Sequence, residues 1–150
     1  MKLVVFSDSH GKDNILPMIR MCDGIAVDKF IFLGDRVADI AALLQDDIIY
    51  VKGNCDALST APELVNVELG GKRVMATHGH RYHVKFSLYP LVREARRLGS
   101  DIVFFGHTHA PLCEEHEGIL LCNPGALCSG SFAVCTIEQG RASVRHMSIK

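Results

Sequence analysis

The sequence has 150 residues, of which 48% are hydrophobic and 22% charged, and its formal net charge is -1. This composition excludes a disordered chain, and the length predicts a single domain, residues 1–150, that buries about 70% of the surface its unfolded form exposes. The small net charge gives no overall electrostatic reason to expect nucleic acid or an acidic membrane as a partner.

The first part of the chain alternates between short apolar runs and amphipathic segments. Runs of β-branched and aromatic residues predict strands at 2–7, 31–33 and 48–51. Between them, apolar residues recur at helical spacing over 14–22 and 37–44. This βαβαβ order predicts a parallel sheet.

After residue 56 the pattern changes to hairpins. Residues 64–69 and 73–77 flank two adjacent glycines, which supply the positive backbone angles of a tight turn and so predict a hairpin in a second sheet. Apolar spacing over 86–98 predicts a surface helix that ends at Gly99. A strand at 102–105 follows.

The remainder of the chain consists of short apolar runs separated by turns that contain glycine. Candidate strands lie at 111–115, 118–122, 131–137 and 141–149. We expect these strands to be antiparallel.

Localisation is predicted from the amino terminus and from the cysteines. The apolar segment after Lys2 stops at Ser7, which is too short for a secretion signal, and no stretch is long enough to span a membrane. The six cysteines show no Cys-x-x-Cys spacing, so we expect reduced, mostly buried thiols. These features predict a cytoplasmic protein.

Side chains that bind metals follow five of the apolar runs. Because the carboxyl ends of strands in α/β sheets meet at one edge, we expect these side chains to gather there. Carboxylate, amide and imidazole ligands without cysteine suit Mn²⁺, Fe²⁺, Co²⁺ or Zn²⁺ in a catalytic site. Seven ligands are too many for one ion that keeps an open position, so we expect two ions that share a carboxylate. The predicted ligands are Asp8, His10, Asp35, Asn54, His78, His107 and His109.

Each motif also has a structural interpretation when it is taken alone. Asp8 or Ser9 could cap the helix that follows, and Asp35 could stand in a turn or at a helix N-cap. Gly53-Asn54 alone would be read as a turn. Four of the eight histidines, however, lie in two short loops beside glycines, and this clustering favours a metal site.

The order Asp-x-His, Gly-Asp, Gly-Asn, His-Gly, Gly-His-x-His, which runs from Asp8 to His109, resembles the calcineurin-like metallophosphoesterases. The chain is most similar to their small YfcE-type phosphodiesterase branch, and the resemblance extends to the turn Asn123-Pro124-Gly125. It implies an α/β fold, a four-layer αββα sandwich in which helices flank two mixed β-sheets.

The resemblance also implies how the ligands are divided. Asp8, His10, Asp35 and His109 would hold the first ion, and Asp35, Asn54, His78 and His107 the second, so that Asp35 bridges. His78 is the expected ligand of the His-Gly pair, and the alternative is His80. The residues expected to take part in catalysis are Asp35, Asn54, Cys55 and His78.

Cys55 departs from the pattern of many family members, which carry Gly-Asn-His-Asp or Gly-Asn-His-Glu where this chain reads Gly53-Asn54-Cys55-Asp56. The histidine of those members is thought to protonate the leaving group, and a thiol is a poorer proton donor at neutral pH than an imidazolium. Cys55 could take that role or be a small buried filler. Asp56 would orient the site or cap the following turn.

The implied activity is that of a dinuclear phosphodiesterase, in which a metal-bound hydroxide attacks phosphorus in line. Mn²⁺ is the expected metal, with Ni²⁺, Co²⁺, Fe²⁺ or Zn²⁺ as alternatives. The substrate would be a small phosphodiester or phosphate ester in an open pocket, because the length leaves no room for a cap domain. Arg36, Arg81 and His83 are either neighbours of the phosphate or solvated surface residues.

Two other classes of function remain open. Some relatives of this fold act as scaffolds in membrane-trafficking complexes, but they tend to lose a ligand histidine, and here His10, His78, His107 and His109 are all present. A nuclease would need a basic groove, and only arginines within 93–97 cluster, so nucleic acid is the least favoured partner. A homo-oligomer is left open.

Overall fold

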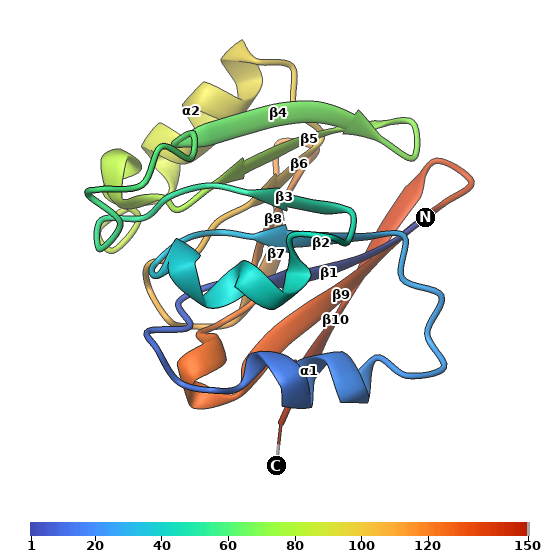
Figure 1. The fold of residues 1–150 in the computed structure, drawn as a ribbon. Coiled ribbons are helices and arrows are strands. Elements are labelled where there is room, and N and C mark those ends of the chain that lie inside the picture. Colours follow the sequence, from blue (N-terminus) through green and yellow to red (C-terminus); the bar gives the residue numbers. More distant parts are fainter. Residues whose placement is uncertain (150) are drawn as a thin grey trace.

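The structure, a computed structural model, describes residues 1–149 and consists of two five-stranded sheets that face each other (Figure 1). In spatial order the first sheet contains β10 (Arg141–Ser148), β9 (Ser131–Glu138), β1 (Lys2–Phe6), β2 (Lys29–Phe32) and β3 (Ile48–Tyr50). The second contains β4 (Leu64–Leu69), β5 (Lys72–Thr77), β6 (Ile102–Phe104), β8 (Ile119–Asn123) and β7 (Leu112–His116).

Both sheets are mixed. β1, β2 and β3 are parallel, as the βαβαβ pattern predicted, whereas β9 runs antiparallel to both β1 and β10. In the second sheet β6 is parallel to β5 and β8, and the two edge strands are antiparallel. The expected antiparallel pairing of the carboxy-terminal strands is found between β7 and β8 and between β9 and β10, but β8 also pairs with β6 in the parallel direction.

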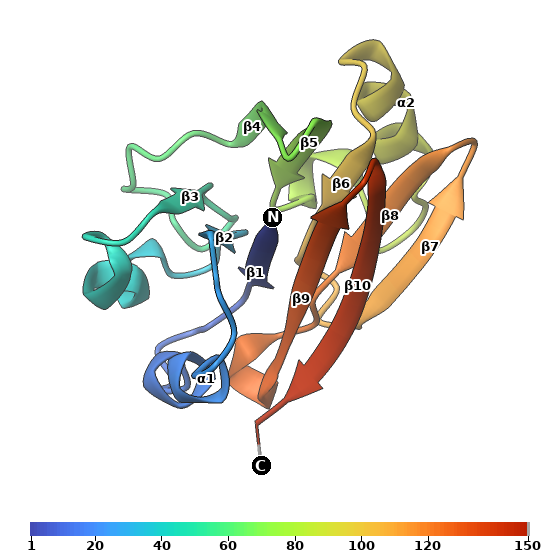
Figure 2. The ribbon, with the colours of Figure 1, turned by 90° about the vertical axis from the view of Figure 1, so that its right-hand side faces the viewer.

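Helices cover the two outer faces. The α-helix α1 (Ile15–Met21) and the 3₁₀-helix η1 (Val37–Leu43) lie outside the first sheet, and α2 (Tyr89–Arg97) lies outside the second (Figure 1). Figure 2 shows the two sheets from the side, with β9 and β10 next to β6, β8 and β7. Two single turns of 3₁₀-helix, η2 (His80–Tyr82) and η3 (Leu127–Ser129), complete the described helices. The predicted four-layer αββα sandwich is confirmed.

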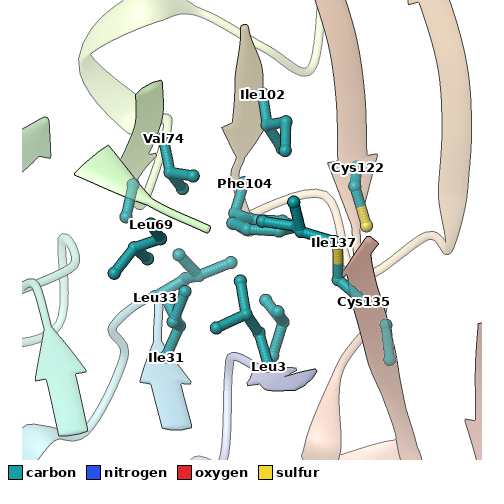
Figure 3. Packing of buried hydrophobic residues seen from close by; sticks show 13 residues of the cluster. Leu3, Ile31, Leu33, Leu69, Val74, Ile102, Phe104, Cys122, Cys135 and Ile137 are labelled. Carbon is teal, nitrogen blue, oxygen red and sulfur yellow. The ribbon is translucent and has the colours of Figure 1, made fainter. Parts of the chain in front are cut away.

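An apolar layer fills the space between the sheets. Leu3, Ile31 and Leu33 of the first sheet face Val74 and Phe104 of the second, and all five are buried (Figure 3). Burial of such side chains stabilises a fold by about 1.5–3 kcal/mol each. The layer therefore fixes the sheets relative to each other, and with them the loops at the ends of their strands.

The segment predicted as a second α-helix, 37–44, is a 3₁₀-helix instead. Val37, Ile40 and Leu43 recur at a spacing of three, which places them on one face only when there are three residues per turn. Ile40 and Leu43 are buried accordingly, whereas Leu44, which an α-helix would have turned inward, is exposed.

The predicted hairpin and the predicted helix end are confirmed in detail. Gly70 and Gly71 join β4 to β5 with φ angles of +58° and +82°, as a two-residue turn of this kind requires. Gly99 has a φ of +69°, and the N–H groups of Gly99 and Ser100 donate to the carbonyls of Arg96 and Ala95. This double hydrogen bond is a Schellman motif, which ends α2.

All six cysteines are free thiols, as expected, but only half of them are buried. Cys22, Cys122 and Cys135 lie in the interior, whereas Cys55 and Cys113 are exposed. Within residues 1–149, no helix has both the length and the apolar character needed to cross a membrane.

Candidate metal centre

The loops that follow β1, β2, β5 and β6 meet at one edge of the sandwich. The N–H of Asp8 donates to the carbonyl of Gly34 at 2.9 Å within the first sheet, and the N–H of Gly106 donates to the carbonyl of His78 at 2.9 Å within the second. These bonds continue the parallel pairing beyond the strand ends. The N–H of His107 donates to Asp8 Oδ2, and this bond holds segments 99 residues apart against each other.

The predicted ligands form two adjoining groups. In the outer group, Asp8, His10 and His109, the possible ligand atoms all lie within 4.8 Å of one another. The inner group, Asp35, His78 and His107, meets the same limit. Asp35 also lies within this limit of His10, so its carboxylate stands between the two groups.

Asp8 is fully buried and is held by the loops on either side of it. Its Oδ2 accepts hydrogen bonds from Ser7 Oγ at 2.5 Å and from the N–H of His107 at 3.2 Å. Its Oδ1 lies 3.1 Å from His109 Nε2 and 3.5 Å from His10 Nε2. The carboxylate of the first sheet is therefore positioned partly by the loop of the second.

Asp35 is also buried, and its two oxygens have different partners. Oδ1 accepts the N–H of Cys55 at 2.9 Å, whereas Oδ2 lies 3.3 Å from His78 Nε2 and 3.7 Å from His10 Nε2. Burial alone would raise the pKa of the Asp35 carboxyl, but the hydrogen bonds from His78 and from the N–H of Cys55 outweigh it and lower that pKa. The group is consequently a carboxylate at neutral pH.

Asp56 ties the loop of Asp35 to the loop after β3. Its buried carboxylate accepts backbone N–H groups from Asp35, Arg36, Val37 and Gly53 at 2.9–3.0 Å. A carboxylate with that many hydrogen bonds has its charge compensated without an ion. Of the two roles considered for Asp56, the structure supports orientation of the site.

His78 is oriented by the backbone of the first sheet. Its Nδ1 donates to the carbonyl of Leu33 at 2.7 Å, which directs Nε2 towards Asp35. A ring nitrogen that donates to a carbonyl is the usual arrangement behind a metal-binding imidazole. Burial would lower the pKa of His78, but the hydrogen bond with Asp35 and the charge of Asp8 raise it. The surroundings of His78 thus favour positive charge at the position where a cation would bind.

Within each group, two histidine rings point a nitrogen atom towards each other. His78 Nε2 lies 3.2 Å from His107 Nδ1, and His10 Nε2 lies 3.3 Å from His109 Nε2. Neutral ring nitrogens that carry lone pairs repel at this distance unless a proton or a cation lies between them. Two such pairs beside two buried carboxylates are a donor set that fits divalent cations.

Two glycines permit this crowding. A Cβ atom on Gly53 would lie 2.1 Å from Asp35 Oδ1, and one on Gly106 would lie 2.1 Å from Ser7 Oγ and 2.8 Å from Asp8 Oδ2. Any larger residue would push the carboxylates out of place. The glycines of the Gly-Asn and Gly-His motifs therefore serve the close approach of backbone to ligand.

The backbone of the centre is strained. Left-handed φ angles are uncommon for residues other than glycine, and such strain collects at functional sites. Within residues 1–149, more than half of the positive φ angles outside glycine belong to the centre. Among the predicted ligands these are Asp8 (56°), His10 (48°), Asp35 (64°), His107 (69°) and His109 (63°).

Three further residues of the predicted site lie at its margin. Asn54 is exposed after β3, and its Nδ2 lies 3.6 Å from Cys55 Sγ. Cys55 is exposed as well, so its interpretation as a buried filler is wrong; its sulfur lies within 4.8 Å of ligand atoms of His10 and Asp35. The ring of His80 is 5.4 Å from that of His78 and outside both groups, a geometry that favours His78 as the ligand.

The capping interpretations of the same motifs are not supported. The helix α1 begins at Ile15, and its N-cap residue Asn14 makes no side-chain cap bond. Ser9 Oγ donates to Asp39 Oδ2 at 2.7 Å, and Asp8 faces the histidines. The interpretation of Gly53-Asn54 as a turn is correct, since the N–H of Asp56 donates to the carbonyl of Gly53.

The supporting roles of two residues were not predicted from the sequence, although one of them, Asn123, belongs to the turn at the end of the family resemblance. Asn123, at the end of β8, donates from Nδ2 to the carbonyl of Gly106 and to Thr108 Oγ1, and so holds the loop that carries His107 and His109. Its position directly after an apolar strand was a usable signal. Asp39 accepts Ser9 Oγ and the N–H of Gly11, and no pattern in the sequence marks it.

Comparisons with known proteins agree on one family. The calcineurin-like phosphoesterase superfamily domain matches residues 1–140. The probable metallophosphoesterase YsnB of Bacillus subtilis is 31% identical over 151 residues, which cover 97% of this chain and 89% of that protein. Phosphodiesterase YfcE of Escherichia coli K12 is 30% identical over 136 residues, which cover 83% of this chain and 63% of that protein.

Solved structures show the same fold. A predicted phosphoesterase from Streptococcus pneumoniae TIGR4 has a TM-score of 0.82 at 28% identity, with 98% of this chain and 88% of that chain covered. Vps29 of Entamoeba histolytica, in a complex with Zn²⁺, has a TM-score of 0.76 at 21% identity with full coverage of both chains, a similarity of fold alone. The chain belongs to the calcineurin-like phosphoesterase superfamily.

Proposed function

We propose that this protein is a metal-dependent phosphodiesterase that uses two divalent cations for in-line attack at phosphorus. The observation that carries the proposal is the pair of adjoining ligand groups that meet at Asp35. The names of YsnB and YfcE support the same class of reaction.

In this proposal Asp8, His10 and His109 would hold one cation, His78, His107 and Asn54 would hold the other, and Asp35 would serve both. Asn54 enters through the family resemblance. When bound, the two cations supply Lewis acidity that activates water and offset the charge of the phosphate. Mn²⁺ is the proposed metal, and Ni²⁺, Co²⁺, Fe²⁺ and Zn²⁺ suit the same donors.

The chain's own residues position these groups. The carbonyl of Leu33 keeps the proton of His78 on Nδ1 and leaves Nε2 to face the centre. The N–H of Cys55 holds one oxygen of Asp35, so that the other oxygen points towards His78 and His10. Such fixed donors need no rearrangement during the reaction.

The test is a panel of phosphate esters assayed with metal-free protein and with protein loaded with each of the five metals. We expect hydrolysis of bis(4-nitrophenyl) phosphate in the Mn²⁺-loaded protein, with two metal equivalents by elemental analysis. Protein without metal should be inactive. Failure to bind any of the ions would contradict the proposal.

The role proposed for Cys55 is to protonate the leaving group, from its place beside Asp35. Replacement of Cys55 by histidine should then alter the pH profile of hydrolysis or shift the preference between diester and monoester. Cys113→His, at an exposed cysteine on β7, is the matched control and should change neither. An unchanged profile in Cys55→His would leave Cys55 without a part in the chemistry.

A scaffold without catalytic activity is the second candidate, favoured by the shared fold with Vps29. Against it stands the complete set of ligand histidines. The scaffold predicts that protein with two bound metals remains inert across the whole panel, whereas a phosphodiesterase turns over at least one ester.

A further inference from the structure

A groove opens beside the metal centre, between the loop after β2 and the loop after β3. It has a volume of about 410 Å³, enough for a small organic group, and apolar side chains form most of its lining. Arg36, Val37 and Ala38 line one side, and Cys55, Ala57 and Leu58 line the other.

Two residues of this groove adjoin the ligands. Cys55 lines the groove, and its sulfur lies within 4.8 Å of ligand atoms of His10 and Asp35. Arg36 directly follows Asp35, and its guanidinium reaches Gly11, where a Cβ atom would lie 2.5 Å from Nη1. A phosphate ester bound at the centre can therefore extend its organic group into the groove.

The walls are fixed before any ligand binds. Asp56 accepts N–H groups from Arg36 and Val37 on one wall and from Gly53 at the start of the other. Arg36 is held at a φ of +93°, a conformation that its hydrogen bond to Asp56 helps to maintain. A preformed groove costs little conformational entropy on binding.

Arg36 gives the groove its chemical character. Its side chain is 60% exposed, and its Nε lies 3.4 Å from Asp39 Oδ1, an ion pair that restrains the guanidinium. Leu58, which lines the same groove, is completely exposed. A planar cation and an exposed leucine that line one groove suit a flat apolar ring, which can stack on the guanidinium.

We propose that this groove is a specificity subsite that binds an aromatic or heteroaromatic group of the phosphoester. Arg36 and Leu58 are then residues that determine specificity, and they select esters with a planar ring over esters with a small alkyl group. The inference rests on the proposed function, since the phosphoryl group must sit at the metal centre.

The test compares phenylphosphonate with methylphosphonate, which share the phosphonate and differ in the group that enters the groove. Binding to Mn²⁺-loaded protein is measured by calorimetry, so that turnover is not required. We expect phenylphosphonate to bind about tenfold more tightly. Arg36→Ala and Leu58→Ala should each remove much of that preference and leave methylphosphonate within about twofold of its original affinity.

Matched controls use exposed residues outside the groove, Arg20→Ala and Leu16→Ala on α1, which should keep the full preference. Arg36→Lys keeps the charge but loses the planar face, and should behave like Arg36→Ala. Equal affinities for the two phosphonates, or a preference that survives both groove substitutions, would overturn the subsite and leave the proposed function standing. Absence of binding by both phosphonates would overturn both.

Discussion

The outer and inner ligand groups contain similar side chains in different surroundings. In the outer group the side chains of His10 and His109 are 31% and 46% exposed, and only Asp8 is buried. In the inner group His78 is fully buried and Asp35 is 3% exposed. The inner group is also fixed by the carbonyl of Leu33 and the N–H of Cys55.

This difference indicates a division of roles. A buried site with fixed ligands holds an ion more tightly, because less of the binding free energy is spent on ordering its ligands. An exposed site exchanges its ion more easily and is more accessible to a ligand. We therefore expect the inner group to retain its metal and the outer group to lose its metal first.

The largest effect is expected from substitution of Asp35, because both ligand groups share its carboxylate. Asp35→Asn should lower kcat/KM by about 10³-fold or more and reduce the metal content below two equivalents, because an amide cannot supply the bridging charge. Elemental analysis and steady-state kinetics measure both effects. The control is Asp13→Asn in the exposed loop before α1, and near-normal activity in Asp35→Asn would refute the shared role.

Asp56 tests whether the rigidity of the inner group depends on the loop behind it. Asp56→Ala leaves backbone N–H groups of Asp35, Arg36, Val37 and Gly53 without their acceptor, which should cost about 3 kcal/mol of unfolding free energy. Urea denaturation measures this loss of unfolding free energy. Asp101→Ala removes a carboxylate with one exposed backbone partner, that of Arg73, and should cost under about 1 kcal/mol. Equal losses of unfolding free energy in the two variants would show that the buried hydrogen bonds of Asp56 add no stability beyond that of an exposed one.

Substitution of one histidine from each group tests directly whether the inner group binds its ion more tightly than the outer group. His78→Ala should weaken binding of the more tightly held ion by roughly a hundredfold, and His109→Ala should weaken the other ion by roughly tenfold. Titration of both variants with Mn²⁺ separates the two ions. Excess Mn²⁺ should restore activity to His109→Ala and not to His78→Ala. The reverse pattern would show that burial does not set the order of affinity.

The smallest expected effect on stability concerns the thiol of Cys135, which is buried in the apolar layer between the sheets. The prediction tests whether ionisation of this thiol destabilises the fold at alkaline pH. Burial raises the pKa of Cys135 to about 12, so the folded protein keeps a neutral thiol where the unfolded chain ionises near pH 8.5. The contribution of this thiol is complete below about pH 8.5 and is lost as the pH rises towards 12. Between pH 8 and pH 10 the loss should be about 2 kcal/mol of unfolding free energy.

Urea unfolding of reduced protein at both pH values measures this loss. Cys135→Ala should reduce the slope between them, although Cys122, whose pKa burial also raises, contributes a slope of its own. Cys128→Ala leaves both buried thiols in place and is the control. An identical slope in Cys135→Ala would exclude this thiol as its source.

Local patterns predicted most of the secondary structure because the strands of this protein coincide with short apolar runs, and the length of such a run can be read from the sequence. The turn at Gly70-Gly71 and the end of α2 at Gly99 follow from φ angles that only glycine adopts easily. The spacing of three in Val37, Ile40 and Leu43 is present in the sequence, but Ala41 and Leu44 also fit an α-helical period, so the sequence pattern alone does not separate the two helix types. The parallel pairing of β8 with β6 could not be read locally, because it depends on which strand lies beside it.

The candidate site divides in the same way. The sequence alone determined which residues could bind metals and that they follow strands, since residue type and strand ends are local properties. Only the tertiary structure decided that Asp35 stands between two groups, that Asp56 ties two loops together, and that Arg36 and Leu58 line one groove. Each of these depends on contact between segments that are distant in the chain, and such contacts exist only once the two sheets have packed on their common apolar layer.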